Sequence, residues 1–125
     1  MSYHNLEIWK LAKKNAIDIH QMTLKELPQF EMYETGSQFR RSSKSTIINI
    51  VEGYGRRRYK QDFIRFLNFS LASNIESINH LELLWETGSL KDQIIFSELM
   101  DSLNLLGKKL YSFLQSVEKG HRSAK

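Results

Sequence analysis

Apolar residues recur at intervals of three and four positions along most of this 125-residue sequence. That spacing places them on one face of an α-helix, whereas a half-buried strand would need strict alternation. A single proline interrupts the pattern, and no stretch shows the alternation of a strand. The sequence is therefore restricted to long amphipathic helices, which must bury their apolar faces against one another.

The positions where this pattern starts and breaks predict four helices, at about 5–27, 37–54, 60–88 and 92–117. Asn5 is expected to cap the first helix, which should end before Pro28 because the residue preceding a proline disfavours the helical conformation. Short links between four helices predict an all-α fold, an antiparallel up-down-up-down four-helix bundle. We expect one domain spanning residues 1–125, with 118–125 as a frayed tail.

The second predicted helix contains several small hydroxyl residues, which suggest that a neighbouring helix approaches closely. These residues are Ser42, Ser43, Ser45 and Thr46. Gly53 and Gly55 are expected to end this helix, because glycine tolerates the left-handed conformation of a helix C-cap. We also expect Asn49 and Asn74 to hydrogen-bond across the bundle and so fix its register.

The first half of the third helix is apolar around most of its circumference. A helix in a four-helix monomer keeps one face in water, so a helix that is apolar nearly all round must be covered by something more. We therefore expect a homo-oligomer in which part of this helix packs against another subunit. The expected interface residues are Phe63, Ile64, Phe66 and Phe69.

The positive charge of the chain is concentrated in one segment. Between residues 40 and 65, eight Lys or Arg face only two acids, Glu52 and Asp62, which gives this segment a net charge of +6, while the chain as a whole carries +4. The basic residues are Arg40, Arg41, Lys44, Arg56, Arg57, Arg58, Lys60 and Arg65. We expect Glu52 to pair with Arg56 at the i,i+4 spacing of a helix.

Two interpretations of this basic segment remain open from the residues alone. It is either a phosphate-binding surface for RNA or DNA, or a solvated face partly paired with acids such as Asp62, Glu31 and Glu34. Under the second interpretation, the protein is an oligomeric scaffold whose partners are proteins only. Tyr54 and Tyr59 flank the arginines and could stack on bases if they are exposed.

No catalytic arrangement is present in the sequence. There is no cysteine, the four histidines are scattered, and no phosphate-binding glycine loop is followed by Lys-Ser or Lys-Thr. Glu76 and His80 are taken as surface residues. We expect a non-enzymatic protein without cofactor or metal, and a cytoplasmic one, since neither a secretory signal nor the roughly 20 apolar residues of a membrane span occurs.

Several motifs resemble a known family. They are NIVEGYGR at 49–56, FIRFL at 63–67 and QFRRS at 38–42. These resemble the Asn-Ile-Ala-Glu-Gly-x-Gly-Arg, Phe-Ile-x-Phe-Leu and Gln-Leu-Arg-Arg-Ala motifs of the small proteins encoded by intervening sequences in bacterial large-subunit ribosomal RNA genes. Ser42 and Ser43 depart from the small apolar residues that are usual there.

The resemblance implies an antiparallel four-helix bundle that assembles into a ring-like homo-oligomer, usually a pentamer. Accessory proteins of diversity-generating retroelements share this architecture and bind nucleic acid and a reverse transcriptase through basic surfaces. The resemblance therefore implies a second copy, RNA or DNA, and another protein as candidate partners.

Overall fold

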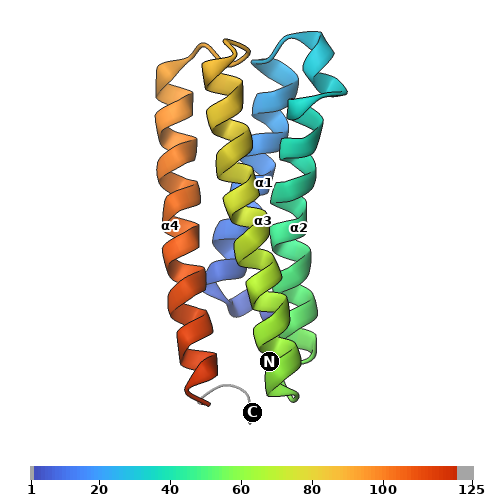
Figure 1. Cartoon of the computed structure of the whole chain (residues 1–125), viewed down its shortest axis with the longest axis vertical. Coiled ribbons are helices and arrows are strands. Elements are labelled where there is room, and N and C mark those ends of the chain that lie inside the picture. Colours follow the sequence, from blue (N-terminus) through green and yellow to red (C-terminus); the bar gives the residue numbers. More distant parts are fainter. Residues whose placement is uncertain (1, 121–125) are drawn as a thin grey trace.

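The computed structural model describes residues 2–120, which form four long α-helices and two short 3₁₀ turns. The helices are α1 (Glu7–Lys25), α2 (Thr35–Gly55), α3 (Lys60–Glu86) and α4 (Gln93–Glu118), with η1 (Tyr3–Asn5) before α1 and η2 (Gln29–Met32) between α1 and α2. Successive α-helices run in opposite directions (Figure 1), and residues 2–120 contain no strand. The predicted four-helix bundle is confirmed. Residues 121–125 of the predicted tail lie outside the described residues.

Three of the predicted helix boundaries agree with the structure. The first helix ends at Lys25, before Pro28, and Gly88 follows α3 with a positive φ of 82°. Asp92 caps α4 by accepting hydrogen bonds from the N–H groups of Ile94 and Ile95. The predicted cap at Asn5 is wrong, because this residue lies inside η1, and α1 begins only after Leu6 without a side-chain cap.

α2 ends at Gly55, one residue after the predicted end, but not through the predicted left-handed glycine cap. Gly53 and Gly55 both lie within the helix, and neither has the positive φ of a left-handed cap. The helix ends instead in a turn, closed by the N–H of Tyr59, which donates to the carbonyl of Arg56 at 2.8 Å. A Cβ at Gly53 would lie 3.1 Å from the Cβ of Phe66, so this glycine permits close packing of α2 against α3.

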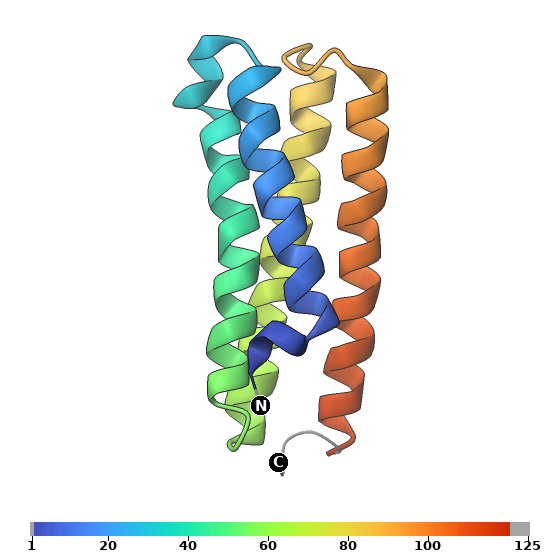
Figure 2. The same ribbon diagram turned by 180° about the vertical axis from the view of Figure 1, so that it is seen from behind.

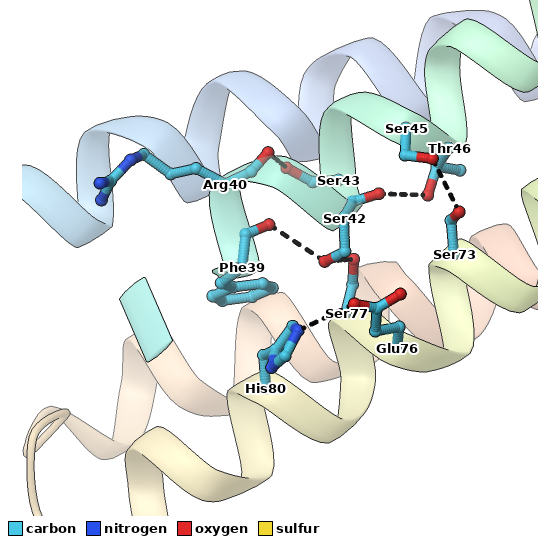
Figure 3. A network of polar contacts seen from close by, with 10 residues as sticks. All are labelled: Phe39, Arg40, Ser42, Ser43, Ser45, Thr46, Ser73, Glu76, Ser77 and His80. Carbon is cyan, nitrogen blue, oxygen red and sulfur yellow. Dashed lines mark hydrogen bonds and ion pairs between the residues drawn. The ribbon is translucent and has the colours of Figure 1, made fainter. Parts of the chain in front are cut away.

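The contact between α2 and α3 is lined by hydroxyl groups (Figure 3). The hydroxyl oxygens of Ser42 and Ser77 are 2.7 Å apart, and those of Ser45 and Ser73 are 2.9 Å apart. Small side chains allow two helix backbones to approach closely, and the hydrogen bonds satisfy groups that would otherwise be buried unpaired. The predicted close approach of a neighbouring helix is therefore confirmed.

The core is divided into two apolar clusters by a polar layer near the middle of the bundle. One cluster, built on Phe63, Leu67 and Leu110, fills the end that contains the α2–α3 turn. The other, built on Phe39, Leu81 and Leu103, fills the opposite end. The buried polar residues of the four helices are Asn15, Thr23, Ser42, Ser43, Thr46, Ser70, Asn74, Ser77 and His80.

The sequence predicts hydrogen bonds across the bundle for Asn74 and Asn49, and a surface position for His80. The amide Nδ2 of Asn74 donates to the carbonyl of Leu103 on α4 at 3.0 Å, which confirms a hydrogen bond across the bundle. Among residues 2–120, the side chain of Asn49 bonds only to Ser45 on its own helix, so the prediction for Asn49 is wrong. His80 is 7% exposed and packs near Phe39, so its assignment to the surface is wrong as well.

Glu31 is a buried carboxylate that joins two connections at one end of the bundle. It is 3% exposed, and its two oxygens accept hydrogen bonds from the N–H of Gly36 (3.1 Å) and the hydroxyl of Ser89 (2.6 Å). These bonds tie the start of α2 to the loop between α3 and α4. Glu31 is therefore part of the fold and is not a surface partner for the arginines.

Candidate functional site

The basic residues predicted as one surface fall into two groups. Arg40, Arg41 and Lys44 lie in the first half of α2, whereas the others lie around the α2–α3 turn at its far end. Arg41 and Arg57 are 16 positions apart, which is about 24 Å at the 1.5 Å rise of an α-helix. The segment is continuous in sequence but does not form a continuous patch in space.

Arg40 has a structural role. One terminal nitrogen of its guanidinium donates to the hydroxyl of Thr23 on α1 at 2.9 Å, and the other donates to the carbonyl of Met32 in η2 at 2.8 Å. The side chain is therefore fixed among three elements. Two of its five N–H donors are engaged in these bonds, so fewer remain for an anionic partner.

Arg41 and Lys44 are exposed on the outer side of α2. They line a shallow depression of about 420 Å³ together with Ser37, Ser45 and Ile48. Neither side chain forms an ion pair with any acid among residues 2–120. Both cations are therefore available to an anionic partner.

Two cations at the far end of α2 are largely neutralised within the chain. Arg56 pairs with Glu52 at 3.4 Å and with Asp62 at 3.6 Å, and Arg65 pairs with Asp62 at 3.7 Å. Both guanidinium groups also lie over the ring of Phe66, at 5.1 and 5.4 Å from its centre. The predicted pairing of Glu52 with Arg56 is confirmed.

The other cations near the α2–α3 turn differ in their contacts with the rest of the chain. Arg57 folds back onto Tyr54, donating to its carbonyl at 2.9 Å and stacking on its ring with 4.1 Å to the centre. Lys60 is half-buried at the start of α3. Arg58 is exposed and has no ion pair among residues 2–120.

The predicted interface residues also separate into core and surface. Phe63 is 1% exposed and belongs to the core of its own chain, so its assignment to an interface between subunits is wrong. Ile64 is half-buried against the same core cluster. Phe66 is half-buried, and Phe69, which meets it edge to face at 5.6 Å, is 48% exposed.

Ile48 extends this apolar surface onto α2. It lies one turn after Ser45, and Phe69 lies one turn before Ser73, the residue to which Ser45 is hydrogen-bonded. Because α2 and α3 are antiparallel, these steps bring Ile48 and Phe69 to the same level of the bundle. Ile48 is 59% exposed. We call Ile48, Phe66 and Phe69 the apolar strip.

The sequence reasoning missed the contribution of α1 to the charged surface. Asn15 faces α4, because its amide donates to the carbonyl of Ser102. Two positions along an α-helix correspond to slightly more than half a turn, so side chains two residues apart point in nearly opposite directions. Lys13 therefore points toward the α2 side, and Lys10 lies one turn before it. Figure 2 shows α1 in front of the bundle beside α2. The sequence shows the spacing of Lys10 and Lys13, but it does not show that α2 lies beside them.

The two halves of the bundle consequently differ in charge. Residues 2–59, which include α1 and α2, carry ten Lys or Arg and six Asp or Glu, a net charge of +4. Residues 60–120, which include α3 and α4, carry six and eight, a net charge of −2. Exposed cations of the first half form what we call the α1–α2 face. We include in it five exposed residues that have no ion pair among residues 2–120, Lys10 and Lys13 on α1, Arg41 and Lys44 on α2, and Arg58 in the turn after α2.

Other features of the described chain do not indicate a catalytic site. A groove of about 800 Å³ runs between α1 and α4, with an apolar floor that includes Leu11, Met22 and Leu99. Within residues 2–120, no group of three or more His, Asp or Glu side chains is placed to hold a metal ion. In the same range, no helix is both long and apolar enough to span a membrane.

Comparison with known families decides the relationship of this chain. The family model of the 23S rRNA-intervening sequence proteins matches residues 4–112, which is most of the bundle. The chain belongs to this family. A comparison with curated proteins finds no match.

A solved structure shows the same fold. It is the crystal structure of a protein with unknown function from the S23 ribosomal protein family of Bacteroides thetaiotaomicron. The two chains are 22% identical, the match covers 86% of this chain and 95% of the other, and the TM-score is 0.78. At this identity, the likeness shows the bundle architecture alone.

The motif at 49–56 of this intervening sequence protein has a structural explanation. Gly53 lets α3 approach, Glu52 pairs with Arg56, and Asn49 bonds back to Ser45 at the α2–α3 seam. All three contacts lie at or beside the junction of α2 and α3. The motif at 49–56 is therefore a packing motif, and the cations of the α1–α2 face lie outside it.

Proposed function

We propose that this 23S rRNA-intervening sequence protein is a non-enzymatic, homo-oligomeric bundle that binds RNA or DNA through the α1–α2 face. The observation that carries the proposal is the charge difference between the two halves of the bundle, +4 against −2. Exposed cations without acidic partners attract phosphate groups, and release of the counterions around nucleic acid drives such binding. Contacts of this kind position a nucleic acid but read little of its sequence.

The apolar strip supports the oligomeric part of the proposal. Ile48 and Phe69 are 59% and 48% exposed, and the ring of Phe66 lies between them and two arginines. A second subunit that covered this strip would remove apolar surface from water. A ring of subunits, a pentamer in the arrangement that the resemblance implies, would repeat the α1–α2 face and multiply its contacts with one nucleic acid.

The test of nucleic-acid binding is a salt series with a charge-reversal variant. Fluorescence anisotropy would measure the dissociation constant for labelled RNA and DNA between about 50 and 200 mM salt. The variant Arg41→Glu/Lys44→Glu removes two exposed cations, and Lys108→Glu/Lys109→Glu makes the same change on α4. We expect the first variant to bind more weakly and the second to bind nearly like the wild type.

The slope of binding against salt gives a second readout. Each phosphate contact contributes about 0.9 to the slope of log K against log salt for duplex DNA and about 0.7 for single strands. The slope should fall by roughly these amounts for each cation that is lost. Absence of salt-dependent binding, or an equal loss in both variants, would refute the proposal.

The apolar strip also favours the alternative, a scaffold that binds only proteins. Sedimentation velocity of Phe69→Glu, with Ile75→Glu as control, tests the assembly itself. Ile75 is 64% exposed on the same helix but lies outside the strip. Dissociation of the first variant alone would support the strip as an interface. An intact assembly that never binds nucleic acid would support the scaffold.

A further inference from the structure

The turn between α2 and α3 presents an aromatic ring on a rigid backbone. The N–H of Arg57 donates to the carbonyl of Tyr54 at 3.2 Å, and the N–H of Tyr59 donates to that of Arg56 at 2.8 Å. The carbonyl of Tyr59 then accepts from the N–H of Phe63 in the first turn of α3, at 3.0 Å. The backbone on both sides of Tyr59 is therefore held by hydrogen bonds that do not involve its side chain.

The structure separates the two tyrosines that flank the arginines. Tyr54 is 8% exposed, packs edge to face on Phe63 and is covered by the guanidinium of Arg57. Tyr59 is 62% exposed. Within residues 2–120, the ring of Tyr59 makes no hydrogen bond, aromatic contact or cation–π contact. Only Tyr59 is therefore available to a partner.

Cations lie on both sides of this ring in the sequence of the turn. Arg58 precedes it, exposed and without an ion pair among the described residues, and the half-buried Lys60 follows it. The nearest acids, Glu52 and Asp62, are engaged with Arg56 and Arg65. In the sequence, the exposed Tyr59 stands between the basic residues Arg58 and Lys60, and an aromatic ring with neighbouring cations matches the chemistry of a single strand, in which bases alternate with phosphates.

We infer that this turn binds single-stranded nucleic acid by stacking a base on Tyr59 while Arg58 and Lys60 contact the adjacent phosphates. The inference rests on the proposed function and specifies its ligand. A base can offer its flat face only when it is not stacked inside a duplex, so Tyr59 favours single strands. Since every base has such a face, the turn discriminates little among sequences.

The experiment compares Tyr59→Ala with Tyr59→Phe, the matched control that keeps the ring. Anisotropy would measure binding of single-stranded RNA, single-stranded DNA and a DNA duplex, each of about 16 nucleotides per strand, the upper end of known single-strand site sizes. Because Tyr59 is exposed and its backbone bonds do not need the side chain, both variants should fold like the wild type. Circular dichroism verifies this.

We expect Tyr59→Ala to bind single strands roughly 5- to 140-fold more weakly, which corresponds to the loss of one stacked base. Tyr59→Phe should bind them like the wild type, and neither change should alter duplex binding. The RNA and DNA arms show which single strand binds more tightly. An oligonucleotide with abasic sites should bind the wild type as weakly as the intact strand binds Tyr59→Ala.

The outcomes distinguish this inference from the function on which it rests. If the wild type binds single strands and duplex but Tyr59→Ala has no selective effect, stacking is refuted and the phosphate-binding proposal stands. Equal losses in Tyr59→Ala and Tyr59→Phe also refute stacking, because the ring is present in only one of them. If the wild type binds none of the three ligands at low salt, both proposals fail.

Discussion

Replacement of Gly53 by alanine would test whether the α2–α3 contact depends on the missing side chain. The new Cβ would lie 3.1 Å from the Cβ of Phe66 and 3.3 Å from the Cδ1 of Phe63. A Cβ atom moves only with its backbone, so no change of side-chain conformation at Phe66 relieves the closer contact. One of the two helices must shift.

The expected magnitude combines two opposing effects. Overpacking of a well-filled site destabilises by about 1–3 kcal/mol, while alanine in place of glycine within a helix stabilises by up to about 1 kcal/mol. Gly53→Ala should therefore destabilise by up to about 2 kcal/mol. Gly55→Ala is the matched control, because nothing lies within 4 Å of a Cβ at that position. The control should be neutral or up to about 1 kcal/mol more stable than the wild type.

Urea unfolding, followed by circular dichroism, would measure both variants at one protein concentration, since assembly makes stability concentration-dependent. For a chain of 125 residues, 1 kcal/mol corresponds to a shift of about 4 °C in Tm. We expect Gly53→Ala to be less stable than Gly55→Ala by about 1–3 kcal/mol. Equal stability of the two variants, or greater stability of Gly53→Ala, would refute the steric explanation.

Arg40 and Arg41 are neighbours in the sequence with opposite expected roles. Arg40→Ala should lower the free energy of unfolding by about 1–3 kcal/mol, because it breaks two hydrogen bonds made by a charged group, and Arg41→Ala should weaken nucleic-acid binding with little effect on stability. The reverse pattern in paired unfolding and anisotropy measurements would contradict these assignments. Glu31→Ala should destabilise by about 1–3 kcal/mol for each of the two buried donors that it leaves unpaired. Glu34→Ala, an exposed acid nearby, should stay within about 0.5 kcal/mol of the wild type in the same urea assay.

The helices were predictable from the sequence because their apolar spacing is a local property. The break at Pro28, the glycine after α3 and the start of the fourth helix near residue 92 depend on residues within one or two turns, and the structure agrees with each of these boundaries. The prediction failed at Asn5 and at Gly53. In both cases, a local signal was overridden by neighbouring structure, a 3₁₀ turn before α1 and the approach of α3 to α2.

The candidate site was only partly predictable. All of its cations could be counted in the sequence, but their partners come from other elements. Arg40 is held by α1 and η2, Arg56 by Asp62 on α3, and Arg57, in the turn, by the ring of Tyr54 on α2. Phe63 shows the same limit for apolar residues, since its spacing could not tell a core position from a surface one.

The order of residues by itself determined that this chain forms four amphipathic helices, because 3.6-residue periodicity, caps and helix breakers act over short distances. Only the tertiary structure decided which cations remain free and that α1 shares a face with α2, because ion pairs and burial depend on residues far apart in the chain. It also decided that Tyr59 is exposed while Tyr54 is buried. Two tyrosines five positions apart in one basic segment carry the same local signal, and helix packing alone separates them.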